Sequence, residues 1–158
     1  MFIRVKRISG QPYAYLVKSV WTDKGARQKN QKYLGKVVKV GSVPYEIPPV
    51  SSSFVRDSLH QLLTAAGFSH DNVYTKDDIQ VSTSVTRHGK PCVLAINDGF
   101  LCDDTLHNAL KLEEQKYIQD LINEGRLTTT LAKSLVEAGL LVDEETYISL
   151  YEYLVPNL

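Results

Sequence analysis

The stretch that decides the fold is residues 2–40, which reads FIRVKRISGQPYAYLVKSVWTDKGARQKNQKYLGKVVKV. Within it, Phe2 to Ile8 and Tyr13 to Trp21 alternate with the period of two that β strands show, and Arg27 to Leu34 is expected to form a polar strand. Short stretches rich in Gly, Pro and Asp separate these segments and indicate turns. The pattern predicts a three-stranded antiparallel β meander over residues 1–42.

The third strand presents different side chains on its two faces. Counting by twos places Arg27, Lys29 and Tyr33 on one face. Gln28, Asn30 and Lys32 fall on the other. Gly35 is expected to mark a bend or bulge before the strand continues to Val40.

Aromatic side chains recur on one face of the second strand. Tyr13, Tyr15 and Trp21 lie there, together with Val17. Such a row most often packs in a core, and we expect this one to do so. A platform on which nucleic-acid bases stack is the alternative.

The rest of the chain divides into a connector and a larger unit. Residues 43–53 are rich in Pro and Ser and form the connector. Residues 54–158 form a unit that begins with a helix, because apolar residues recur at helical spacing from Val55 to Ala66. A β-hairpin is expected next, with Ile79 to Val85 turning back into Cys92 to Ile96.

Helices are expected after the hairpin. Asp103 or Asp104 caps the first, whose apolar stripe runs on to Gly125. Thr128 caps the second and Asp143 caps the third. The chain is therefore α+β: a β meander, then a helix, a hairpin and an acidic C-terminal helical unit.

The charge of the chain is split. Residues 1–50 hold ten Lys/Arg against two acids, a net +8, and residues 51–158 hold eight against sixteen, a net −8. An asymmetry of this kind indicates that one half faces a polyanion.

Three strings carry a resemblance: Tyr13-Ala14-Tyr15-Leu16-Val17-Lys18-Ser19, Gly25-Ala26-Arg27-Gln28 and Tyr33-Leu34-Gly35-Lys36. They resemble the small β module at the front of some insertion-sequence transposases and of short archaeal proteins. The resemblance implies nucleic-acid contact. It does not imply strand transfer, because the transposase core, of the ribonuclease H type with three separated carboxylates, has no counterpart in the remaining residues.

The basic sheet is the candidate binding site. Positive side chains contact phosphates, and aromatic rings and planar amides contact bases or sugars. The expected binding residues are Arg4, Lys6, Lys18, Lys24, Arg27, Gln28, Lys29, Lys32, Tyr33 and Lys36.

We predict a non-enzymatic nucleic-acid-binding protein. RNA is favoured over DNA, because a basic sheet suits recognition of shape and backbone. The acidic helices offer a face to a partner protein. The alternative is an adaptor or self-associating protein whose +8 half docks on the −8 half of a neighbour.

Three other readings are weaker. His88, Cys92, Cys102 and His107 depart from zinc-finger spacing, so no metal or other cofactor is expected. Asp98, Asp103 and Asp104 near His107 leave metal-assisted nuclease chemistry open, but turn and capping roles are expected. Residues 113–139 imitate a helix–turn–helix, yet residues 103–158 hold four Lys/Arg against eleven acids, a net −7 that phosphates would repel.

The compartment follows from what the sequence lacks. No apolar run is long enough to cross a bilayer, and the N-terminus has no apolar segment of the signal-peptide kind. Two cysteines give no disulfide framework. We expect a reduced, cytoplasmic protein with no membrane partner.

Overall fold

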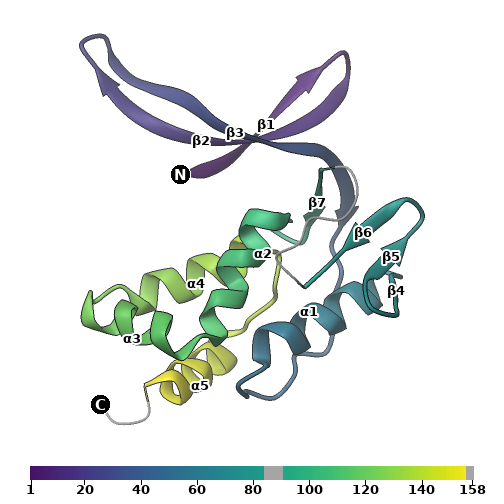
Figure 1. The fold of residues 1–158 in the computed structure, drawn as a ribbon, viewed down its shortest axis with the longest axis vertical. Coiled ribbons are helices and arrows are strands. Elements are labelled where there is room, and N and C mark those ends of the chain that lie inside the picture. Colours follow the sequence, from purple (N-terminus) through teal and green to yellow (C-terminus); the bar gives the residue numbers. More distant parts are fainter. Residues whose placement is uncertain (84–90, 156–158) are drawn as a thin grey trace.

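The computed structural model describes residues 1–83 and 91–155 (Figure 1). Its strands are β1 (Phe2–Ile8), β2 (Gln11–Thr22), β3 (Gly25–Gly41), β4 (Ser69–His70), β5 (Tyr74–Lys76), β6 (Ile79–Val81), β7 (Cys92–Ile96) and β8 (Gly99–Leu101). Its helices are α1 (Phe54–Ala65), α2 (Asp103–Leu110), the 3-10 turn η1 (Lys111–Glu113), α3 (Gln115–Asn123), α4 (Leu127–Glu137) and α5 (Glu144–Leu154). The predicted α+β class is confirmed.

The predicted meander is present as β1, β2 and β3, which pair in antiparallel register. β3 continues through Gly35 as one strand, and it is long enough to pair twice. Residues 25–36 pair with β2, and residues 36–41 pair in parallel with β7. β8 completes a five-stranded sheet in the order β1-β2-β3-β7-β8.

The predicted hairpin between Ile79–Val85 and Cys92–Ile96 is wrong. β6 pairs with β5 in a separate three-stranded sheet, whereas β7 lies between β3 and β8. The apolar run of β7 explains its position, because both of its faces are covered. Leu94 and Ile96 pack in the main core, and Val93 and Ala95 pack in a second cluster. Residues 84–90, which would contain the turn of that hairpin, lie outside the described residues.

The main apolar core lies between α1, the β7–β8 region and the C-terminal helices. From α1 it takes Leu59, Leu62 and Leu63, which follow the helical spacing seen in the sequence. The α4 residues Leu131 and Leu135 belong to the same core and have almost no exposure. The acidic C-terminal helices thus share one apolar core with α1 and the β7–β8 region.

The helix ends agree only in part with the expected caps. Asp143 caps α5, where its carboxylate accepts a hydrogen bond from the Thr146 N–H at 2.7 Å. Cys102 rather than Asp103 or Asp104 is the N-cap of α2, and Arg126 rather than Thr128 is that of α4. The expected first helix is interrupted at η1 and Glu114, so it forms α2 and α3.

Two hairpin arms project from the helical body (Figure 1). One is the β1–β2 hairpin, and the other is the distal part of the β2–β3 hairpin, where residues 18–22 pair with residues 25–29. None of the helices in the described ranges is long and apolar enough to cross a bilayer.

Candidate nucleic-acid interface

The two faces of the meander differ from those that strict alternation predicts. Register shifts fall between Ala14 and Tyr15 and between Leu16 and Val17, and they leave Leu34 and Gln31 of β3 as extra residues. Each bulge reverses the alternation along β3. Tyr33 therefore shares a face with Gln28 and Asn30, while Lys32 shares the other face with Arg27 and Lys29. The predicted grouping is wrong for Tyr33 and Lys32.

We call the first of these faces the tyrosine face: Arg4, Lys6, Tyr13, Tyr15, Gln28, Asn30, Tyr33 and Lys36. Side chains of β1 reach across β2 to β3 on it. The Arg4 guanidinium donates to the Gln28 side-chain oxygen, and the Lys6 ammonium donates to the Asn30 side-chain oxygen at 3.1 Å. The two cations are positioned by amides, which leaves their remaining N–H groups available to a ligand.

Three tyrosine rings gather on this face. The Tyr33 ring centroid lies 5.4 Å from that of Tyr15 and 6.4 Å from that of Tyr13. The Lys6 ammonium lies 5.0 Å from the Tyr15 ring centre, a cation–π distance. None of the three tyrosines belongs to either apolar cluster, and Tyr33 is 47% exposed.

The distal β2–β3 hairpin carries the most exposed aromatic residue. Trp21 is 84% exposed, opposite Ala26 on β3, next to a turn where the Thr22 hydroxyl donates to the Gly25 carbonyl. The expectation that Trp21 packs in the core is therefore wrong. Residues 18–22 lie beyond the end of β1, so the arm is a two-stranded ribbon with no third strand against it in the described chain. Such a ribbon has no interior in which to bury an indole.

The opposite face of the meander is apolar at its base and basic at its tip. Ala14 and Leu34 pack there with Val37, Val93 and Cys102 in the second cluster. Further out, the same face carries Lys18, Arg27, Lys29 and Lys32. The ribbon therefore has cations on one side and polar and aromatic groups on the other.

The structure disperses the ten predicted residues over both faces of the sheet. Arg4, Lys6, Gln28, Tyr33 and Lys36 belong to the tyrosine face, because Lys36 pairs with Tyr13. Lys18, Arg27, Lys29 and Lys32 point the other way, and Lys24 lies in the arm's turn. All ten are exposed except Lys6, which is half-buried.

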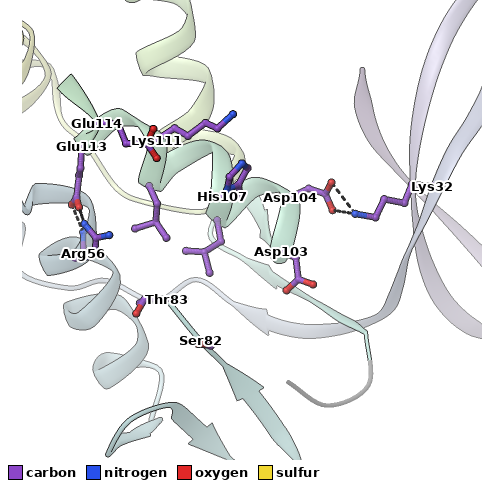
Figure 2. Close-up of a pocket in the computed structure, with 12 residues that line it drawn as sticks. Lys32, Arg56, Ser82, Thr83, Asp103, Asp104, His107, Lys111, Glu113 and Glu114 are labelled. Carbon is purple, nitrogen blue, oxygen red and sulfur yellow. Dashed lines mark hydrogen bonds and ion pairs between the residues drawn. The ribbon is translucent and has the colours of Figure 1, made fainter. Parts of the chain in front are cut away.

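One contact joins the basic sheet to the acidic half. The Lys32 ammonium lies 2.9 and 3.1 Å from the two Asp104 carboxylate oxygens (Figure 2). Among the ion pairs within the described ranges, this one alone involves a basic side chain of the meander. Within the described ranges, the acidic half therefore pairs with a single cation of the meander, Lys32.

Lys32 and Asp104 border an open pocket of about 690 Å³ between α1, α2 and the end of β6 (Figure 2). Its walls carry both signs of charge, and Asp104 and Glu113 are among its paired carboxylates. Asp104 pairs with Lys32, and Glu113 pairs with Arg56 while also accepting the Arg56 backbone N–H at 2.9 Å. His107 and Asp103 lie on the same wall, as the sequence predicts from their spacing.

The cysteines are not activated nucleophiles. Burial raises the pKa of both the Cys92 and Cys102 thiols, so both stay protonated near neutral pH. In the described part of the chain, no group of three or more His, Cys, Asp or Glu side chains is arranged to hold a metal ion. His88, one of the four ligands weighed for zinc, lies outside that part.

The sequence did not predict a cluster of two histidines and a tyrosine beside α1. His60 of α1 lies 3.0 Å from the Tyr74 hydroxyl through its Nδ1, and the His70 ring stacks on Tyr74 with 4.1 Å between centroids. His70 and Tyr74 are paired residues of β4 and β5, and they meet His60 because the small sheet packs beside α1. No periodic signal in the sequence points to this meeting.

A scan of protein-family models and searches of curated proteins and of solved structures find no match to this chain.

Proposed function

We propose that this protein binds nucleic acid through the tyrosine face and the β2–β3 arm of its N-terminal sheet, with RNA preferred over DNA and without catalysing a reaction. One observation carries the proposal. Cations, planar amides and an exposed aromatic ring lie together on a face that packs against neither apolar cluster.

The cations supply the phosphate contacts. Arg4 and Lys6 are held in place by Gln28 and Asn30, so less side-chain freedom is lost when a phosphate binds. The arm adds Lys24 in its turn, and Arg27 and Lys29 on its other side. A strand of nucleic acid lying along the arm would meet positive charge at several successive phosphates.

The preference for RNA rests on the polar groups beside these cations. Gln28 and Asn30 each carry an N–H₂ group that the hydrogen bonds to Arg4 and Lys6 do not use. Such groups donate to phosphate oxygens and to the 2′-hydroxyl, which distinguishes RNA from DNA.

The acidic helices serve a different role in this proposal. Net negative charge around α2 to α5 repels phosphates and confines the nucleic acid to the sheet. These helices also offer a face for a partner protein. A cytoplasmic location belongs to the same proposal and is supported by two cysteines that form no disulfide.

The binding test is fluorescence anisotropy of labelled single-stranded RNA, duplex RNA and duplex DNA over a series of salt concentrations. The variant Arg27→Glu/Lys29→Glu changes the net charge by −4, and so does the control Lys116→Glu/Lys133→Glu on the acidic helices. Loss of two phosphate contacts lowers the salt slope for a single strand by about 1.4. We expect the sheet variant alone to show it.

Failure to bind any of the three nucleic acids at low salt would refute the proposal. Equal losses in the two double variants would show that net charge, and not this surface, attracts the ligand.

Self-association or adaptor function is the second candidate, and one observation favours it. The Lys32–Asp104 ion pair joins the basic sheet to the acidic half within one chain. The same pairing between chains would give an oligomer that dissociates as salt is added. Sedimentation of the protein alone, at low and high salt, separates this candidate from a nucleic-acid-binding monomer.

A further inference from the structure

The tyrosine face contains more aromatic surface than phosphate contact requires. Phosphates need cations and N–H donors, which the arm and Arg4 already supply. Yet the face also holds three tyrosine rings, and Trp21 lies on the same side of β2. These rings lie beside cations and amides and pack in neither apolar cluster, so their exposed surface is available to a ligand.

The two most exposed rings differ from the others in what surrounds them. Lys6 lies over the Tyr15 ring, and both Tyr15 and Tyr13 are half-buried beside Tyr33. Tyr33 is 47% exposed and Trp21 is 84% exposed. Tyr33 and Trp21 therefore have ring surface free for a ligand, and Tyr13 and Tyr15 support Tyr33 from the side.

The form of the nucleic acid follows from these rings. In a duplex the base faces are stacked on one another and only phosphates, sugars and base edges are accessible. In a single strand the bases are free to stack on tyrosine and tryptophan. Tyr33 and Trp21 are separated along the sheet by about six residues of β2, roughly 20 Å, which spans several nucleotides.

We infer that the ligand of the tyrosine face is single-stranded RNA, whose bases stack on Tyr33 and Trp21 while its phosphates contact Arg4, Lys6 and the arm. This inference rests on the proposed function and narrows it. A purely electrostatic surface would instead accept duplexes at least as well as single strands.

The molecule contains its own reporter, because Trp21 is its single tryptophan. Titration with an oligouridylate should change the indole emission of Trp21 as a base stacks on it. Duplex RNA and duplex DNA of the same length are titrated in parallel. We expect the single strand to bind more tightly than either duplex and to give the larger change.

Substitutions test Tyr33 separately. Tyr33→Leu should lose about tenfold in affinity for the single strand, because one stacking contact is removed, and Tyr33→Phe should retain affinity. Tyr153→Leu is the matched control, since Tyr153 of α5 is 48% exposed but lies on the acidic half. Circular dichroism and thermal melting establish that each variant is folded.

The outcomes separate the inference from the function it rests on. Binding of no nucleic acid at all refutes the proposed function. Binding that favours a duplex, or that Tyr33→Leu leaves unchanged, overturns the inference while the proposed function stands. Unchanged emission at saturation overturns the stacking assigned to Trp21.

Discussion

Substitution of Gly35 by alanine tests the junction that connects the interface to the core. Gly35 lies where β3 passes from pairing with β2 to pairing with β7. Its φ is +135°, a conformation that side chains disfavour. A Cβ atom there would lie 2.5 Å from the Pro91 backbone carbonyl atoms and 2.8 Å from the Cys92 nitrogen.

The loss of stability in Gly35→Ala can be estimated from this positive φ and from the close approach to Pro91 and Cys92. A strained φ costs about 1–3 kcal/mol. Forcing backbone apart in a packed region costs about 1–3 kcal/mol more, because backbone atoms cannot rotate out of the way. Lower entropy of the unfolded alanine chain returns about 0.4–1 kcal/mol. We expect a net loss of about 3 kcal/mol, or roughly 6–12 °C in Tm for a chain of this size.

Urea denaturation followed by circular dichroism measures the loss, and Gly41→Ala is its control. Gly41 also belongs to β3 and pairs with β7, with φ of +93°, but a Cβ there meets no atom within 4 Å. The control therefore carries the φ strain without the close approach. If Gly35→Ala costs no more than Gly41→Ala, the proximity of β3 to Pro91 is not what requires glycine.

Three further outcomes are expected. Burial raises the pKa of Tyr45 to about 12 from 10.0, so the contribution of the protonated Tyr45 hydroxyl to stability is complete below pH 10 and is lost between pH 10 and 12. The difference in free energy of unfolding between wild type and Tyr45→Phe should shrink over that range, and a constant difference would contradict the raised pKa. Cys92 and Cys102, whose thiol pKa values are raised, should react with iodoacetamide more slowly in the folded than in the unfolded protein, as followed by mass spectrometry. Asp104→Asn should free Lys32 and steepen the salt slope of RNA binding by up to about 0.7, and an unchanged slope would mean that Lys32 contacts no phosphate. The same substitution should change the free energy of unfolding by less than about 1 kcal/mol, because the Lys32–Asp104 pair is part-exposed.

The sequence predicts the strands of the meander well, because alternation with a period of two extends over most of residues 2–22. It fails for the faces of β3, where Gln31 and Leu34 are bulged. A polar residue and a leucine give no signal of a bulge in one sequence, yet each reverses the faces of all residues beyond it. The position of Tyr33 beside Tyr13 and Tyr15 is therefore visible only in the structure.

The strand that pairs with β7 could not be predicted from the sequence either. Short apolar strands near one another predict a hairpin, since local pairing is the commonest choice. The parallel pairing of β7 with β3 joins residues more than 50 positions apart, such as Val37 and Val93. What favours it is that β7 gains apolar contacts on both faces, a tertiary effect that no local pattern contains.

The continuity of β3 links the interface to the core. A two-stranded arm has marginal stability by itself, and the side chains that suit a ligand here, such as Trp21 and Lys29, are exposed and add little to a core. β3 compensates because its far end, from Lys36 to Gly41, is anchored by β7. The orientation of the arm is therefore determined by pairing that lies outside the interface. It follows that a ligand contacting both the arm and the tyrosine face meets a largely preformed surface, so that less of the binding free energy is spent on ordering it.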